Sequence, residues 1–260
     1  MIERYLTIKA LEDNLTVILS VNSCEYCING DGNWISLSAD TETSSINKGD
    51  TLSFRGNLTP TQSNGIGTFN VNKSFELMGN CMSMIFGDDT NSNNSLRSYS
   101  YAFAYLFKNC TTLKSVSENF LPATTLSEWC YGNMFMGCTS LIVAPALPAM
   151  KLEACCYVNM FSGCTSLLVA PVLPATTLAR KCYGGMFSFC YSLIDSPVLP
   201  ATTLADWCYS GMFHRCVSLT KSPVLPAEKL TKYCYMGMFY GCNKLEHIEM
   251  LATDINAERC

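Results

Sequence analysis

The strongest constraint on the fold of this chain is an internal repeat. A Met-Phe pair recurs at 26-residue steps, at Met134, Met160, Met186, Met212 and Met238. An imperfect earlier copy begins at Leu106, 28 residues before Met134. A fixed period in this range is typical of repeats that bury their apolar faces only when neighbours stack on them. The sequence therefore predicts a solenoid with 26-residue coils.

Apolar and proline columns predict the parts of each coil. Aligned phenylalanines and leucines, such as Phe161 and Leu167, form two core columns, and each buried side chain contributes about 1.5 to 3 kcal/mol. Proline columns, such as the one through Pro171, limit the strands because proline has no N–H to donate. We expect a short strand at about 141–144, a second extended piece at 176–178, and a helical turn over each Cys-Tyr-x-x-Met-Phe-x-x-Cys segment.

The repeat resembles a known family. The pattern Met-Phe-x-x-Cys-x-Ser-Leu, followed by a short strand and Leu-Pro, is similar to the BspA-like leucine-rich repeats of bacterial surface proteins over about residues 106–260. This repeat is longer than the commoner one of the family and carries a second cysteine. The resemblance implies a leucine-rich-repeat solenoid that serves adhesion of a bacterial cell to a host or to other bacteria.

Residues 1–80 differ in character from the repeats. Seven short runs rich in β-forming residues, separated by turn signals such as Asn64-Gly65, predict a small Ig-like β-sandwich. The runs are 5–10, 15–21, 24–28, 34–37, 51–56, 68–71 and 75–78. Within this domain only Trp34, Tyr26 and Phe54 favour a carbohydrate-binding face. We expect residues 81–105 to form a linker and N-terminal cap, and residues 106–260 to form the repeats. The fold class expected is thus mainly β, a β-sandwich followed by a leucine-rich-repeat solenoid.

Composition and charge exclude several functions. The net charge of -4 argues against a nucleic-acid partner, which needs a basic face. No apolar run approaches the ~20 residues of a membrane span, so we expect a chain that does not span the membrane. The N-terminus has neither the basic start nor the apolar core of a secretory signal.

Sixteen cysteines raise the question of disulfides and metals. Most form two ladders, one through Cys138 and Cys164 and one through Cys130 and Cys156. Rungs ~4.8 Å apart would permit disulfides, but each ladder thiol has equivalent neighbours on both sides, so we expect small, buried, reduced cysteines. The only C-x-x-C, at Cys24, has no matching pair, and no catalytic motif is present. We expect no metal, no cofactor and no enzymatic activity.

Two sets of positions vary while their neighbours repeat, which means that the scaffold does not dictate them. The first is the turn before Cys-Tyr and the second follows the core leucine. The candidate ligand-binding residues are therefore Trp129, Lys181, Trp207, Tyr233, Ile142, Leu168 and Ile194. Repeat proteins use such columns as binding surfaces. The alternative is that these side chains simply cover the edges of the coils.

The function expected is a non-enzymatic binding or adhesion protein. Its partner would be a protein or glycan on a host cell or a neighbouring bacterium, and its location the cell surface or the secreted fraction. An alternative is a structural or adhesion protein of a phage particle, which would be virion-associated. The C-terminal end of the solenoid is a further candidate for self-association.

Overall fold

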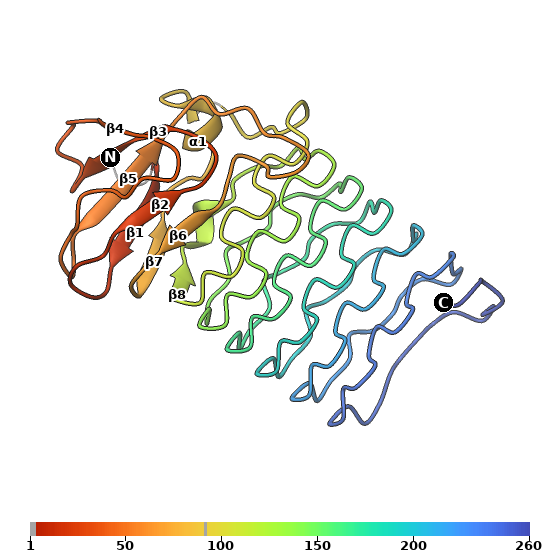
Figure 1. Ribbon diagram of the computed structural model, residues 1–260. Coiled ribbons are helices and arrows are strands. Elements are labelled where there is room, and N and C mark those ends of the chain that lie inside the picture. The colour runs from red at the N-terminus through yellow and green to blue at the C-terminus, as the bar shows by residue number, and fades with distance from the viewer. Residues whose placement is uncertain (1–3, 91–92) are drawn as a thin grey trace.

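The computed structural model describes residues 4–90 and 93–260, and the chain is mainly β. A sheet at the N-terminal end is followed by a row of coils that runs to the C-terminus (Figure 1). The strands are β1 (Leu6–Ala10), β2 (Val17–Leu19), β3 (Cys24–Ile28), β4 (Ile35–Leu37), β5 (Thr51–Arg55), β6 (Phe69–Val71), β7 (Phe75–Met78) and β8 (Leu113–Val116). The short helices are α1 (Ser83–Phe86) and the 3-10 helix η2 (Glu118–Phe120).

The seven strands predicted in residues 1–80 are confirmed. They form a six-stranded mixed sheet, in the order β4-β3-β5-β1-β7-β8, and a two-stranded sheet of β2 and β6. Alternation of polarity fixes which side of a strand is buried, as in β7, where Phe75 and Leu77 are buried and Glu76 and Met78 are partly exposed. These sheets do not by themselves establish an Ig-like sandwich, which stays a prediction.

The sheet continues into the repeats. β8 belongs to the first coil and pairs in parallel with β7, with Leu77 opposite Val116. Beside this pairing, the ring of Phe69 stacks on that of Phe107 with centroids 5.2 Å apart. One hydrophobic core therefore runs from the sheet into the coils, across the boundaries expected from the sequence.

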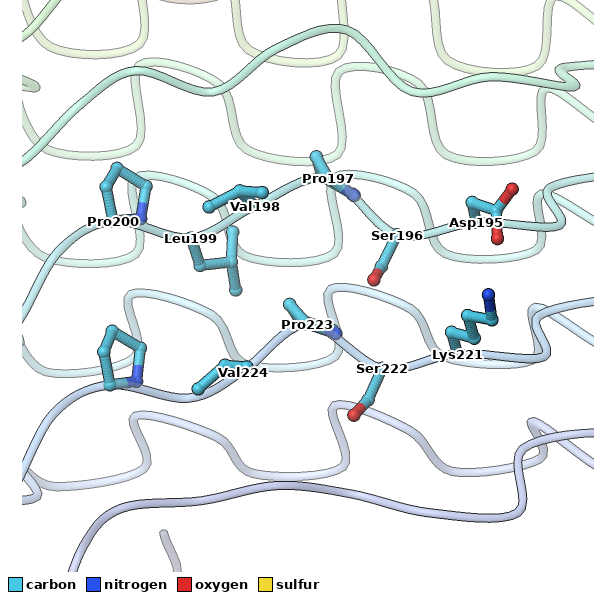
Figure 2. Close-up of a pocket in the computed structure, with 11 residues that line it drawn as sticks. Asp195, Ser196, Pro197, Val198, Leu199, Pro200, Lys221, Ser222, Pro223 and Val224 are labelled. Atoms are coloured by element: carbon cyan, nitrogen blue, oxygen red, sulfur yellow. The ribbon is translucent and has the colours of Figure 1, made fainter.

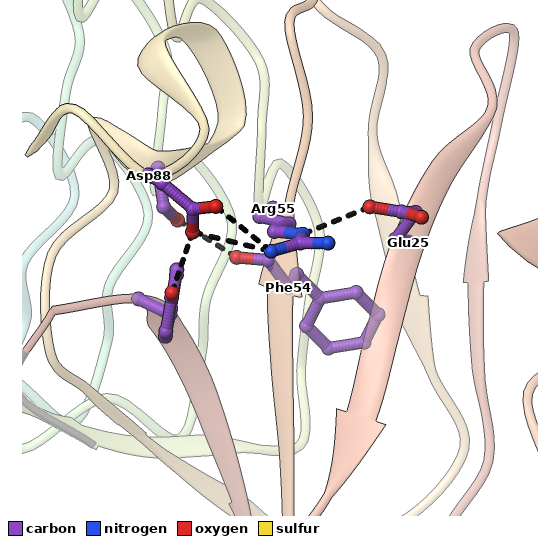
Figure 3. A network of polar contacts seen from close by, with 6 residues as sticks. Glu25, Phe54, Arg55 and Asp88 are labelled. Atoms are coloured by element: carbon purple, nitrogen blue, oxygen red, sulfur yellow. Dashed lines mark hydrogen bonds and ion pairs between the residues drawn. The ribbon is translucent and has the colours of Figure 1, made fainter. Parts of the chain in front are cut away.

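A polar network fastens the segment after α1 to the sheet (Figure 3). Arg55 on β5 contacts Glu25 on β3 at 2.8 Å and Asp88 at 3.0 Å, and its guanidinium lies 4.1 Å from the ring of Trp34. Tyr5 donates a 2.6 Å hydrogen bond to Asp88. This bond, followed by the charge of Arg55, lowers the pKa of the Asp88 carboxyl.

The prediction of a helical turn in each coil is wrong. Its place is taken by a nine-residue turn segment, and the six segments are 101–109, 129–137, 155–163, 181–189, 207–215 and 233–241. The first, middle and last residue of every segment has a positive φ, between 50° and 77°. A left-handed residue at every fourth position cannot continue a right-handed helix.

The backbone hydrogen bonds of the turn segment alternate in direction. Tyr131 and Phe135 donate to the next coil, to the carbonyls of Cys156 and Met160, both at 3.0 Å. Met134, between them, donates locally to Tyr131 at 3.2 Å. The segment is thus a chain of tight turns bound sideways to its neighbour, and this lateral bonding replaces the bonds of a helix.

The side of each coil opposite the turn segment is extended, but little of it forms a regular β-strand. Parallel bridges connect Val143 to Val169, Val169 to Asp195, and Asp195 to Lys221. A second line of bridges includes the one between Lys151 and Thr177. In these coils the four-residue strand expected at 141–144 shrinks to a single bridging residue, because prolines follow directly and cannot extend the ladder.

Stacked rings and thiols fill the space between the two sides. Phe135 and Phe161 stack with centroids 5.7 Å apart, and Tyr157 and Tyr183 at 5.8 Å. The expected burial of the cysteines is confirmed for every one except Cys260, and the structure has all sixteen as free thiols. In the first ladder each thiol from Cys138 onwards donates to a carbonyl of the preceding coil, as Cys164 does to Phe135 at 3.2 Å.

The last turn segment leaves one edge of this ladder open. Tyr233 still donates its N–H to the carbonyl of Glu258 at 2.9 Å. The following N–H groups that would point to a next coil have no acceptor among the residues that the structure describes, and they belong to Tyr235, Gly237, Phe239 and Gly241. The C-terminal edge is therefore a row of hydrogen-bond donors.

Candidate binding surfaces

The first candidate set, which we call the turn column, lies in the turn before each Cys-Tyr pair. Its four residues share one strained backbone position. Trp129, Lys181, Trp207 and Tyr233 are the first residues of their turn segments, with φ of 59°, 56°, 63° and 57°. Such a conformation costs a side-chain-bearing residue about 1 to 2 kcal/mol. Asparagine or glycine, which adopt it more easily, fill the middle position of five of the six segments and never the first. The first position therefore keeps its side chains despite the strain.

These side chains line one edge of the stack. Trp207 and Tyr233 stack with ring centroids 4.1 Å apart, and Trp129 stacks on Tyr101 at 5.7 Å. Between the two pairs lie Lys181, which is half-buried, and a buried cysteine. The rings also cover the coils, since a Cβ added to Gly132 would lie 2.6 Å from Trp129. Covering the coil edge is thus one role of this column.

An ion pair lies at the C-terminal end of the turn column, beside Tyr233. Lys232 contacts Glu258 at 2.7 Å, and the hydroxyl of Tyr233 donates to the same carboxylate at 2.6 Å. Hydrogen bonds from Lys232 and then Tyr233 lower the pKa of the Glu258 carboxyl. Tyr233 is therefore held by its own chain, whereas Trp129 and Trp207 make no side-chain hydrogen bond with the described residues.

The second candidate set lies on the extended side and is exposed. Ile142, Leu168 and Ile194 occupy equivalent positions in three successive coils. Further exposed valines surround them, and Val169, Val172 and Val198 have 72%, 78% and 79% of their surface accessible. Contiguous apolar exposure of this kind marks interaction surfaces. We call the surface formed by these residues with Val143 and Val224 the apolar face.

A shallow groove crosses the apolar face between two coils (Figure 2). Its volume is about 420 Å³, and it is lined by residues 195–200 of one coil and by residues 221–224 and Pro226 of the next. Val198 and Val224 lie towards one end, and Asp195 and Lys221 lie at the other (Figure 2). The groove therefore offers an apolar floor beside one charge of each sign.

The two candidate sets do not form a single site. The turn column belongs to the turn segments and the apolar face to the extended segments that follow them. No hydrogen bond or ring contact among the described residues joins the two sets. The chain thus presents two separate surfaces rather than one pocket.

Two of the three aromatic residues that favoured a carbohydrate-binding face of the N-terminal sheet are not available for that role. Tyr26 and Phe54 are buried in the core, where Tyr26 hydrogen-bonds to Ser44. Trp34 is partly exposed, but its ring packs on Tyr5 and Arg55. Alternation within the strands turned two of these three aromatics inwards.

One cluster of aromatic and cationic side chains was not predicted from the sequence. Phe189, Tyr191, His214, Arg215 and Tyr240 come from three successive coils and contact one another at the ends of the turn segments. Equivalent positions in earlier coils hold small residues such as Gly163 and Thr165. A simultaneous change in three columns that flank the Cys190 column is the sequence signal that could have revealed it.

The described residues contain no group of three or more His, Cys, Asp or Glu side chains placed to hold a metal ion. No helix among them is both long enough and apolar enough to cross a membrane. Comparison with protein-family models, with curated proteins and with solved structures finds no match to this chain.

Proposed function

We propose that this chain is a non-enzymatic binding protein of the adhesin type, built as a BspA-like leucine-rich-repeat solenoid behind a small Ig-like β-sandwich. The observation that carries the proposal is the apolar face. Its side chains stay exposed over successive coils, although the same coils bury the Phe column from Phe135 to Phe213 and the Leu column from Leu141 to Leu219. A surface that the fold leaves uncovered in this way is suited to a macromolecular partner.

The partner proposed is a protein or glycan on a host cell or a neighbouring bacterium. Valines and isoleucines of the apolar face supply desolvation energy, and the groove near Asp195 and Lys221 supplies polar contacts at its rim. The half-buried Trp129 and Trp207 are a second candidate surface, since tryptophan is enriched among residues that dominate binding energies.

Attachment of protein-coated beads tests the proposal. Beads carrying the chain are added to cultured epithelial cells and to bacterial cells, with albumin-coated beads as background. We expect the double variant Val169→Lys, Val172→Lys to lose attachment at least ~10-fold, since each charge must be desolvated at the interface. The matched control is Thr176→Lys, Thr202→Lys, which adds the same charge at exposed threonines outside the apolar face.

Attachment equal to albumin on both cell types, or full attachment of the double valine variant, would contradict this assignment. The same assay with Trp129→Ala and Trp207→Ala decides whether the turn column contributes. Protease treatment of intact source cells tests the location. Cleavage at the surface supports an adhesin, protection inside the cells opposes it, and recovery with phage particles would assign the same surface to a virion.

A further inference from the structure

The cluster at the ends of the turn segments departs from the repeat in three columns at once. Two earlier coils show what the scaffold needs there, with Met136, Gly137 and Thr139 in one and Ser162, Gly163 and Thr165 in the next. The three coils that follow place aromatic or cationic side chains at five of the nine equivalent positions. These residues, named the aromatic–arginine cluster, are Phe189, Tyr191, His214, Arg215 and Tyr240.

Two members of the cluster strain the backbone. Phe189 and Arg215 are the last residues of their turn segments, with φ of 61° and 58°. Glycine holds this position in three other segments, including Gly137 and Gly163. A non-glycine residue costs about 1 to 2 kcal/mol here, and the coils with glycine stack in the same way. Folding therefore does not require these side chains, and strain of this kind is typical of functional sites.

The rings form one continuous aromatic surface. His214 stacks on Tyr240 with centroids 5.1 Å apart and planes inclined by 14°. Phe189 meets His214 edge-on at 5.4 Å and Tyr191 at 6.4 Å. The ends of this surface face solvent, since Tyr191 is 43% and Tyr240 63% exposed. The rings lie outside the Phe and Tyr columns of the core and are not needed to fill it.

Arg215 adds an available cation to this surface. Its guanidinium lies 5.9 Å from the ring of Phe189, and its side chain makes no ion pair or hydrogen bond with the residues that the structure describes. Gly241 of the next coil makes room for it, since a Cβ there would lie 3.0 Å from Cγ of Arg215. An exposed guanidinium with all its donors free is suited to the fork geometry of a carboxylate or sulfate.

We infer that the aromatic–arginine cluster binds an acidic glycan, a sugar that carries a carboxylate or sulfate. The C–H face of the sugar ring packs on the exposed aromatic surface, and Arg215 pairs with the acidic group. A single cation among several rings fits a sugar better than an acidic peptide, which needs several cations along its length. The inference rests on the proposed binding function and names one class of ligand for it, at a surface separate from the apolar face.

A glycan array with neutral, sialylated, uronate-containing and sulfated oligosaccharides tests the inference. We expect the chain to retain acidic glycans and not their neutral counterparts, and the array distinguishes carboxylate from sulfate. Arg215→Gln should weaken binding by about 10- to 100-fold, as expected for loss of a charge-assisted hydrogen bond. Arg180→Gln, at an exposed arginine outside the cluster, is the matched control.

Phe189→Gly separates binding from folding. It restores the residue found at this position in other coils, so we expect a melting temperature equal to or above that of the wild type, together with loss of glycan binding. Retention of no glycan, retention of neutral glycans alone, or unchanged binding by Arg215→Gln overturns the inference. Bead attachment that depends on Val169 and Val172 would still support the proposed function, so the two failures are distinguishable.

Discussion

A buried column of tyrosines carries hydroxyl groups that the fold does not satisfy. Tyr157 and Tyr209 are fully enclosed, and neither hydroxyl has a hydrogen-bond partner among the described residues. A buried hydroxyl without a partner loses its bonds to water and regains none on folding. The value of these residues to the stack therefore lies in their rings.

This reasoning predicts that Tyr157→Phe does not destabilise the protein. We expect the free energy of unfolding in urea to stay the same or rise by ~1 kcal/mol, because the ring stays and an unsatisfied group leaves. Tyr26→Phe is the control, since Tyr26 hydrogen-bonds to Ser44 at 3.0 Å and its loss should lower stability by ~1 kcal/mol. A loss at Tyr157 as large as that at Tyr26 would show that its hydroxyl does have a partner.

Buried thiols make stability sensitive to alkaline pH. Burial raises the pKa of Cys164 from 9.0 to about 12. The unfolded thiol ionises first, so its contribution to stability is complete below pH 9.0 and disappears as pH rises towards about 12. We expect the free energy of unfolding to fall by on the order of 1 kcal/mol per pH unit for each such thiol in that window. Urea unfolding across the window measures the slope, and Cys164→Ala should make it shallower. An identical slope in that variant would contradict the assignment.

At the scale of the element, the turn segment depends on its left-handed positions. Gly211, in the middle of its segment, has a φ of 63°, and a Cβ added there meets nothing within 4 Å. Any loss on substitution therefore reports the backbone alone. We expect Gly211→Val to lower the unfolding free energy by about 1 to 2 kcal/mol and Gly211→Asn to lower it less, as measured by urea unfolding. Equal losses for the two variants would point to side-chain crowding instead.

The elements differed in how far they could be predicted. Alternating polarity placed Cys24–Ile28 and Phe75–Met78 correctly to the residue. The turn segments could not be recognised as easily, because bulky residues such as Trp129 occupy left-handed positions without any sequence mark of that conformation. Regular spacing of Met and Phe over such a segment resembles a helical turn, although its backbone bonds go to the neighbouring coil.

The candidate surfaces were predictable in part for a related reason. Ile142 and Leu168 stood out because their own columns vary, and they lie on the exposed apolar face. The aromatic–arginine cluster spans three columns, so no single column identifies it. Proximity between Phe189 and His214 becomes visible only once the coils are stacked.

At the scale of the whole molecule, the open C-terminal edge bears on self-association. Its donor row, at Tyr235, Gly237, Phe239 and Gly241, needs carbonyl groups opposite it. A second copy that met this edge with its own would bring donors against donors. We therefore expect no edge-to-edge dimer of residues 1–260 in sedimentation-velocity centrifugation at micromolar concentration, and a concentration-dependent dimer lost in Phe239→Ser would contradict this expectation.

The bonds between neighbouring turn segments all run from one coil to the next, and this direction also sets an order of assembly. Each completed coil exposes N–H groups that only the next 26 residues can accept, and the parallel pairing of β7 with β8 starts the series on the sheet. Because domains form from the N-terminus during synthesis, the sheet emerges from the ribosome before any coil that depends on it. The chain can thus be built as it is translated, with every coil serving as the template for its successor.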